Sequence, residues 1–242
     1  MKICAFLWIY YGFPASSYEG VNVEHVRNRC GEMLAKHEGV EEARKNFDAV
    51  VGVPDSGTAH ALGYAQTAGL PYRRAFVKYT PTWPRSFIPA NQSSRALVAS
   101  MKLLPVEDFV KDNRLLFCED SVVRGTQLRD TIVRLKELGV KEIHMRAACP
   151  PILFNCKYLN FSPAHSVMEL ASRRAIAYLE GDCEKNLDEY MKEGSEKYEA
   201  MVRKIGEELH LTSLKYQTLD DMIRAIGLPR EKLCTYCWDG KD

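Results

Sequence analysis

The chain has 242 residues, of which 46% are apolar, 27% charged and 10% aromatic, and this composition is typical of a folded globular protein. It excludes a disordered chain, a collagen-like repeat and a coiled coil. The 33 Lys and Arg residues nearly balance the 32 Asp and Glu residues, which leaves a net charge of +1. We therefore expect no binding to nucleic acid or to an anionic membrane through a general positive field, and an anionic ligand would need a local site.

The first long uncharged stretch, residues 3–18, contains Gly12 and Pro14. These residues interrupt its apolar part, which is shorter than the roughly 18–20 residues of a membrane-spanning helix. Lys2 is the only basic residue ahead of it and no small-residue cleavage site follows, so the stretch does not resemble a signal peptide. We expect a cytoplasmic protein whose eight cysteines are reduced thiols or metal thiolates rather than disulfides.

Strand-like and helix-like segments alternate up to Pro150. Short apolar runs bounded by polar or turn residues predict buried parallel strands at residues 47–53, 114–118 and 142–147. Amphipathic runs predict helices at residues 23–36, 58–67 and 126–138. The alternation indicates an α/β fold with a mostly parallel sheet, whose ligand should lie at the carboxyl ends of the strands.

The pattern changes after Pro151, where we expect helices and no further strand. Helix-like runs cover residues 166–180 and 219–226, and apolar side chains at near-helical spacing predict a solvated amphipathic helix over residues 186–205. We expect a single domain over residues 1–242. Its core would span about residues 22–165, and a helical C-terminal region, about residues 166–242, would pack back on the N-terminal segment.

Residues 115–126, LLFCEDSVVRGT, carry the clearest chemical signal in the sequence. A buried strand ends in two adjacent carboxylates, Glu119 and Asp120, and a short loop of small and hydroxyl residues then begins a helix. Such a loop offers backbone N–H groups and the positive end of a helix dipole to a phosphate. The carboxylates can bind vicinal hydroxyls directly or through Mg²⁺. The combination favours a sugar phosphate over the alternative of an ordinary acidic strand end with a Ser/Thr cap.

The same residues resemble the phosphoribosyl pyrophosphate motif of type I phosphoribosyltransferases and, within that fold, the amidophosphoribosyltransferase family. Further segments that match the family are residues 53–57 (VPDSG) with 61–65 (ALGYA), similar to its pyrophosphate loop; Lys78, residues 85–89 (RSFIP), Gln92 and Arg95, similar to its flexible loop; and residues 149–152 and 228–237. The resemblance extends from Cys4 to Gly240. It implies the type I phosphoribosyltransferase fold, a mostly parallel sheet flanked by helices, with a helical C-terminal extension.

The resemblance implies a pentosyl transfer in which ammonia displaces pyrophosphate from phosphoribosyl pyrophosphate and gives phosphoribosylamine, as in purine biosynthesis. Catalysis would depend on positioning and on electrostatic stabilisation of the charges that develop. Glu119 and Asp120 would hold the ribose hydroxyls and Mg²⁺, with Ser56 near the metal. The implied 5′-phosphate residues are Ser121, Val122, Val123, Arg124, Gly125 and Thr126; the pyrophosphate residues are Asp55, Ser56 and Gly57; and Lys78 and Arg85 would neutralise the leaving group.

The sequence departs from the family in three places. The family's enzymes begin with a glutaminase domain, and nothing corresponding to it precedes Met1, so we expect a transferase half that uses ammonia from solution or from a separate glutaminase subunit. Residues 79–84 (YTPTWP) replace the polar run expected between Lys78 and Arg85, which affects loop closure or the choice of acceptor. Residues 182–202 form an insertion without an assigned catalytic role. We also expect a homo-oligomer.

Cys234 and Cys237 form a C-x-x-C pair, a moderate metal or redox signal. No thioredoxin-like context surrounds it, which disfavours redox activity. Some amidophosphoribosyltransferases carry a [4Fe–4S] cluster on four cysteines, and Cys4, Cys156, Cys234 and Cys237 stand at the corresponding places. Four thiolates also suit zinc, so both metals stay open. Either centre would have a structural role and would tie both ends of the chain to the core.

Two alternatives accompany the ammonia-dependent reaction. The first is a phosphoribosyltransferase with another acceptor, a base or an amine, selected by the altered loop. The second is a non-catalytic regulator that binds phosphoribosyl pyrophosphate. Residues 55–57, Lys78 and Arg85 favour catalysis, because a sensor need not retain groups on the pyrophosphate side, and the lack of a basic excess disfavours a gene regulator.

Overall fold

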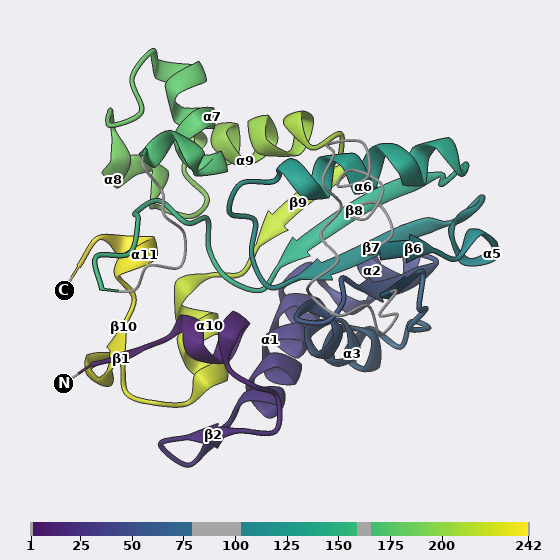
Figure 1. Cartoon of the computed structure of the whole chain (residues 1–242), viewed down its shortest axis with the longest axis horizontal. Helices are drawn as coiled ribbons and strands as arrows, with labels where there is room; N and C mark the ends of the chain where they lie inside the picture. Colours follow the sequence, from purple (N-terminus) through teal and green to yellow (C-terminus); the bar gives the residue numbers. More distant parts are fainter. Residues whose placement is uncertain (1, 79–102, 159–165, 242) are drawn as a thin grey trace, which may run out of the picture.

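The computed structural model describes residues 2–78, 103–158 and 166–241 (Figure 1). Its first elements are β1 (Ile3–Cys4), the π-helix η1 (Leu7–Tyr11), β2 (Ser17–Tyr18), β3 (Val21–Asn22), α1 (Val23–Glu38), α2 (Val40–Asn46), β4 (Ala49–Gly52), α3 (Gly57–Ala68) and β5 (Phe76–Lys78). The middle of the chain forms β6 (Leu103–Pro105), α5 (Glu107–Val110), β7 (Arg114–Glu119), α6 (Thr126–Glu137) and β8 (Glu142–Ala147). The rest forms the 3₁₀ turn η2 (Val167–Glu169), α7 (Ala171–Glu180), α8 (Leu187–Tyr190), α9 (Glu196–Glu208), β9 (Ser213–Tyr216), α10 (Leu219–Ile226), η3 (Arg230–Lys232), β10 (Leu233–Cys234) and α11 (Tyr236–Asp239).

Four parallel strands form the central sheet in the order β4–β7–β8–β9. In its register, Phe117 of β7 lies between Val51 of β4 and Met145 of β8. Strands β5 and β6 form a separate antiparallel pair. The α/β class with a mostly parallel sheet is therefore confirmed.

Helices cover both faces of this sheet, which explains why its strands are apolar at consecutive positions. Side chains of β7 alternate between the two sides. Leu116 and Cys118 pack with α1, α3 and α10, whereas Leu115 and Phe117 pack with α6, α7 and α9. Figure 1 shows these two groups of helices below and above the sheet.

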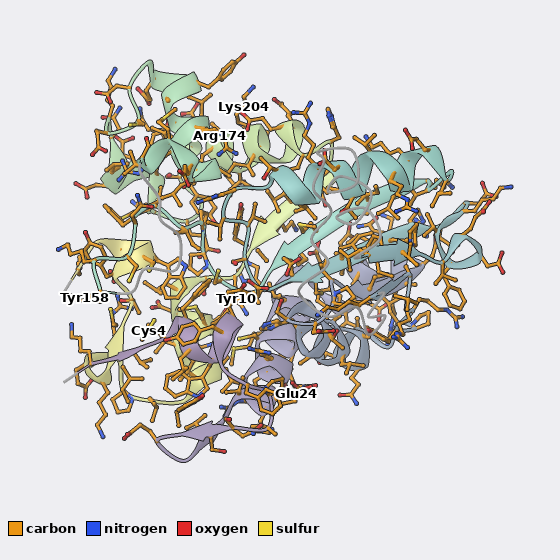
Figure 2. The ribbon with its side chains drawn as sticks, viewed as in Figure 1. Cys4, Tyr10, Glu24, Tyr158, Arg174 and Lys204 are labelled. Atoms are coloured by element: carbon orange, nitrogen blue, oxygen red, sulfur yellow. The ribbon has the colours of Figure 1, made fainter. Side chains whose placement is uncertain are left out.

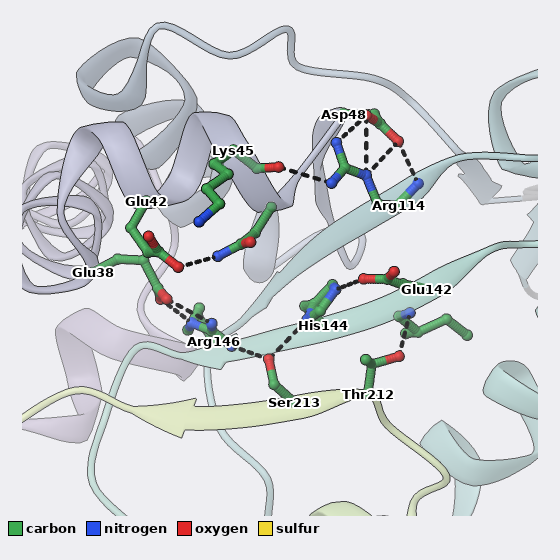
Figure 3. A network of polar contacts seen from close by, with 12 residues as sticks. Glu38, Glu42, Lys45, Asp48, Arg114, Glu142, His144, Arg146, Thr212 and Ser213 are labelled. Carbon is green, nitrogen blue, oxygen red and sulfur yellow. Dashed lines mark hydrogen bonds and ion pairs between the residues drawn. The ribbon is translucent and has the colours of Figure 1, made fainter.

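A buried ion pair joins the last turn of α1 to β8 (Figure 3). Arg146 donates from Nε to Glu38 Oε2 at 2.5 Å and from Nη2 to Glu38 Oε1 at 3.0 Å, and the two side chains are only 3% and 4% exposed. Lys215 of β9 also donates to Glu38 Oε1, at 3.0 Å. Burial alone would raise the pKa of Glu38, but the hydrogen bonds and charges of Arg146 and Lys215 outweigh it and hold this pKa below its usual value.

The expectation that no strand follows Pro151 is wrong. Strand β9 completes the central sheet and β10 pairs with β1. Both are short, and β9 has buried Leu214 and Tyr216 on either side of exposed Lys215. Such short segments become strands because a neighbouring strand pairs with them, which a local pattern does not show.

The single helix expected at residues 186–205 is divided into α8 and α9. Helix α8 ends at Tyr190, and Gly194 adopts a φ of 73° in the turn that leads to α9. Ser195 then caps α9, since its side chain accepts a hydrogen bond from the Tyr198 N–H. The helix expected at residues 166–180 likewise consists of η2 followed by α7.

The two ends of the described chain lie side by side (Figure 1). Strand β1 pairs in parallel with β10, so that Cys4 lies opposite Cys234. Next to β1, the buried Arg27 of α1 donates three hydrogen bonds to backbone carbonyls at residues 8, 10 and 12 and thereby holds the η1 turn. Within the three described ranges, no helix combines the length and the apolar character needed to cross a membrane.

Candidate functional site

A cavity of about 1060 Å³ opens where β4 and β7 end. It is lined by residues of two loops that each connect a strand to a helix, as expected for an α/β sheet. From the β7–α6 loop the lining residues are Glu119, Asp120, Ser121, Val122, Val123, Arg124, Gly125 and Thr126, and from the β4–α3 loop they include Pro54 and Ser56. The structure therefore brings most of the predicted site residues to one cavity.

Glu119 and Asp120 place two carboxyl groups at the end of β7. Asp120 is buried and accepts a 2.5 Å hydrogen bond from the Ser121 hydroxyl, while its own N–H donates to Glu119 Oε1 at 3.1 Å. Burial, followed by the neighbouring Asp120 carboxylate, raises the pKa of Glu119 well above its usual value. A cation or donating hydroxyl groups between the two would relieve this repulsion.

No three His, Cys, Asp or Glu side chains among the described residues surround one metal position. A magnesium ion at Glu119 and Asp120 would therefore need further oxygen ligands. This pattern suits Mg²⁺, which commonly binds one or two carboxylates together with water and substrate phosphates.

The loop after the carboxylates leads into α6, whose N-terminal cap is Gly125. Gly125 has a φ of 75°, and a Cβ there would lie 2.8 Å from Cδ2 of Leu209 in the segment after α9. A side chain is thus disfavoured both by the backbone conformation and by the close approach. The first N–H groups of α6 have no acceptor within the helix, so this end of the cavity presents donors to an anion.

The β4–α3 loop approaches β7 so closely that Gly57 must lack a side chain, because a Cβ there would lie 2.4 Å from the Cys118 carbonyl oxygen. The peptide bond between Pro54 and Asp55 in this loop is cis. Lys78, at the end of β5, donates from Nζ to Asp55 Oδ2 at 2.6 Å. Lys78 and the predicted pyrophosphate loop are thus adjacent, whereas Arg85, Gln92 and Arg95 lie outside the described residues.

The four cysteines nominated as metal ligands are neighbours. Cys4 and Cys234 are paired across β1 and β10, and the Cys237 thiol forms a hydrogen bond with Cys156. Burial, and then the nearby thiols of Cys156, Cys4 and Cys234, raise the pKa of Cys237 to about 12. Cys156 and Cys237 also line the cavity. Figure 2 shows Cys4 beside the C-terminal segment.

Part of the cavity lining was not predicted from the sequence. Tyr10 of η1, Asn155 and Glu169 of η2 all contribute to its lining. They come from segments with no recognisable motif. The burial of Arg27, which binds the backbone of η1, could have been predicted. It lies on the apolar face of the helix expected at residues 23–36, where an arginine needs buried hydrogen-bond partners.

The sequence was compared with known proteins, and no protein-family model matches it. It is 31% identical over 238 residues to the amidophosphoribosyltransferase of Methanocaldococcus jannaschii, covering 98% of this chain and 43% of the relative. It is 34% identical over 242 residues to that of Mycobacterium tuberculosis, covering 99% of this chain and 40% of the relative. The chain is homologous to one part of the amidophosphoribosyltransferases.

Solved structures agree with this relationship. Glutamine phosphoribosylpyrophosphate amidotransferase from B. subtilis, in complex with ADP and GMP, superimposes with a TM-score of 0.75 at 30% identity, over 99% of this chain and 46% of that one. The fold is therefore the type I phosphoribosyltransferase fold of these amidophosphoribosyltransferase structures. The chain spans less than half the length of the relatives it matches.

Proposed function

We propose that the chain transfers the phosphoribosyl group of phosphoribosyl pyrophosphate to ammonia, with release of pyrophosphate. The observation that carries the proposal is the meeting of three groups at one end of the sheet. These are the Glu119–Asp120 pair, the anion-binding turn before α6, and the Asp55–Lys78 pair at the β4–α3 loop. Their order fits a ligand with a phosphate at one end, vicinal hydroxyls in the middle and a second anionic group at the other end.

In the proposed complex, the N–H groups of residues 121–126 bind the 5′-phosphate and the two carboxylates hold the ribose hydroxyls. Residues 55–57 bind pyrophosphate, with the N–H groups of Asp55 and Ser56 as donors, because the Gly57 N–H already donates to the Val53 carbonyl at 2.9 Å. Lys78 turns from Asp55 toward the leaving group. When bound at the carboxylates, Mg²⁺ offsets the negative charge of the pyrophosphate. The residues act mainly by fixing the substrate and by stabilising the charges that develop on ribose and pyrophosphate.

The nitrogen source is the second part of the proposal. We infer that ammonia comes from solution or from a separate glutaminase subunit, and that the protein acts in purine biosynthesis as a homo-oligomer. The place in purine biosynthesis is supported by the relatives, which are amidophosphoribosyltransferases, and by a structural neighbour described as the allosteric regulatory enzyme of purine biosynthesis, with a TM-score of 0.76 at 30% identity.

Purified protein supplied with phosphoribosyl pyrophosphate and Mg²⁺ is expected to release pyrophosphate when ammonia is added, and not with glutamine alone. Lys78→Met should lower the rate on the order of 10²-fold, because it removes a positive charge from the leaving-group side. The rate of pyrophosphate release measures both effects.

Lys111→Met is the matched control, because Lys111 is exposed and lies before β7, at the opposite end of that strand from Glu119. Equal rates with glutamine and ammonia would contradict the proposed nitrogen source. Release that depends on a purine or pyrimidine base instead would replace ammonia with another acceptor.

We further propose that Cys4, Cys156, Cys234 and Cys237 bind a [4Fe–4S] cluster with a structural role. Their mutual proximity supports four thiolate ligands, although no three of them surround a single point. A cubane cluster takes one thiolate on each of its four irons, which matches four cysteines brought together from three segments of the chain. Zinc would use the same four ligands.

Protein purified without oxygen is expected to contain about four irons per chain. Cys237→Ser should remove most of the iron and lower the melting temperature, since the cluster would join the C-terminal segment to β1 and the cavity wall. Iron analysis and thermal unfolding measure the two effects. Cys183→Ser, which changes a thiol outside the cluster, should leave both unchanged. One zinc per chain would keep the ligands and change the metal; iron-free protein from this preparation would contradict the proposal.

A further inference from the structure

The loop before α6 is held from outside by the C-terminal region of the chain. Two consecutive carbonyl groups of this loop accept hydrogen bonds from α7. The Val123 carbonyl accepts from the Ala171 N–H at 2.8 Å, and the Arg124 carbonyl accepts from Nη2 of Arg174 at 2.6 Å. Both acceptors belong to the segment that lines the cavity.

These two contacts fix the orientation of two peptide planes. In a trans peptide the carbonyl of one residue and the N–H of the next point in opposite directions, and the peptides after Val123 and Arg124 are trans. Their carbonyls face α7, so the N–H groups of Arg124 and Gly125 point away from it. The left-handed conformation of Gly125 continues this turn into α6. Successive N–H groups in such a turn form an anion-binding nest.

Arg174 is itself held by neighbouring groups. Its Nη1 donates to the Glu169 carbonyl at 2.9 Å, and its Nε lies 4.0 Å from Oε2 of Glu208 in α9. The Glu169 carboxylate in turn forms an ion pair with the Arg124 side chain. Figure 2 shows Arg174 between α7 and α9. One guanidinium group therefore connects the loop to η2 and to α9.

We propose that Arg174 is a positioning residue for the 5′-phosphate, an inference that rests on the function proposed above. By holding the Arg124 carbonyl, it keeps the Gly125 N–H directed at the phosphate before the ligand arrives. Without this contact the peptide can rotate, and binding would have to restore its orientation. The loss would affect the phosphate end of the ligand and not the pyrophosphate end.

The test uses ribose 5-phosphate and pyrophosphate as separate probes of the two ends, titrated calorimetrically in the presence of Mg²⁺. Arg174→Met is expected to weaken ribose 5-phosphate binding about tenfold, the scale of one charged hydrogen bond, and to leave pyrophosphate binding unchanged. In the full reaction it should raise KM for phosphoribosyl pyrophosphate with little change in kcat. Arg174→Lys, which can still donate to the Arg124 carbonyl, should recover part of the affinity.

Arg224→Met is the control, because Arg224 is an exposed arginine of α10 that pairs with Asp221 and not with the loop. This variant should bind both probes as tightly as the unsubstituted chain does. Unchanged ribose 5-phosphate binding by Arg174→Met would overturn the inference, as would an equal loss for both probes, which indicates a general structural role. Failure of the unsubstituted chain to bind ribose 5-phosphate would instead overturn the proposed function and this inference with it.

Discussion

Replacing Asp120 with Asn is expected to weaken Mg²⁺-dependent binding of phosphoribosyl pyrophosphate by on the order of 1.5–3 kcal/mol, or about 10- to 150-fold. The substitution keeps the size of the side chain and removes its charge. Asp120 is buried next to the end of β7 and its carboxylate accepts a hydrogen bond from Ser121, so the position of this charge is fixed before the ligand binds. Equilibrium binding with and without Mg²⁺ measures the effect.

Asp188→Asn makes the same chemical change at an exposed position of α8 and should leave the affinity unaltered. The Mg²⁺ dependence is the decisive part of the measurement. If Asp120→Asn binds the ligand as tightly as the unsubstituted chain does in Mg²⁺, then Asp120 does not belong to the binding site.

Replacing Glu38 with Gln is expected to lower the free energy of unfolding by about 3–5 kcal/mol, because it leaves the charge of Arg146 buried without its partner. Chemical denaturation at neutral pH measures this loss. The double substitution Glu38→Gln with Arg146→Met should cost less than Glu38→Gln alone, because it removes the unpaired charge as well. Asp48→Asn, which breaks the more exposed pair with Arg114, should cost no more than about 1 kcal/mol.

The Glu38–Arg146 pair also makes the free energy of unfolding depend on pH. Because folding lowers the pKa of Glu38, its contribution to stability is complete above the usual glutamate pKa of about 4.3 and declines as the pH falls through the lower pKa of the folded state. The stability difference between the unsubstituted chain and Glu38→Gln should therefore shrink in acid. A difference that stays constant from neutral pH to below pH 3 would contradict this account.

The central strands could be predicted because runs of consecutive apolar residues indicate strands that are buried on both faces. Strand β8 and helix α10 have the predicted bounds, and β7 is one residue longer than expected. Strand β9 could not be found in this way, because two buried side chains in four residues do not distinguish a strand from a turn of helix. Residues 213–216 form a strand because they pair with β8, which is distant in the sequence.

The site residues also fall into two groups, those that are contiguous in the sequence and those that come from distant segments. Glu119 to Thr126 are contiguous, so one strand and the start of one helix place them together whatever the rest of the chain does. Tyr10, Glu169 and Arg174 reach the same region from distant segments of the chain. Their positions depend on how η1 and α7 pack against the rest of the chain, and this packing cannot be predicted from the spacing of residues in the sequence.

The parallel pairing of β1 with β10 has a consequence for the order of folding. The backbone groups of Ile3 and Cys4 meet their partners in this sheet only when Leu233 and Cys234 are present. A chain that is still emerging from the ribosome can form α1, α3 and the early strands, but it cannot close this pair. Contacts between such distant positions have a high entropic cost of loop closure and slow the final step. Strand β1 is thus secured only after the segment that contains β10 has been made.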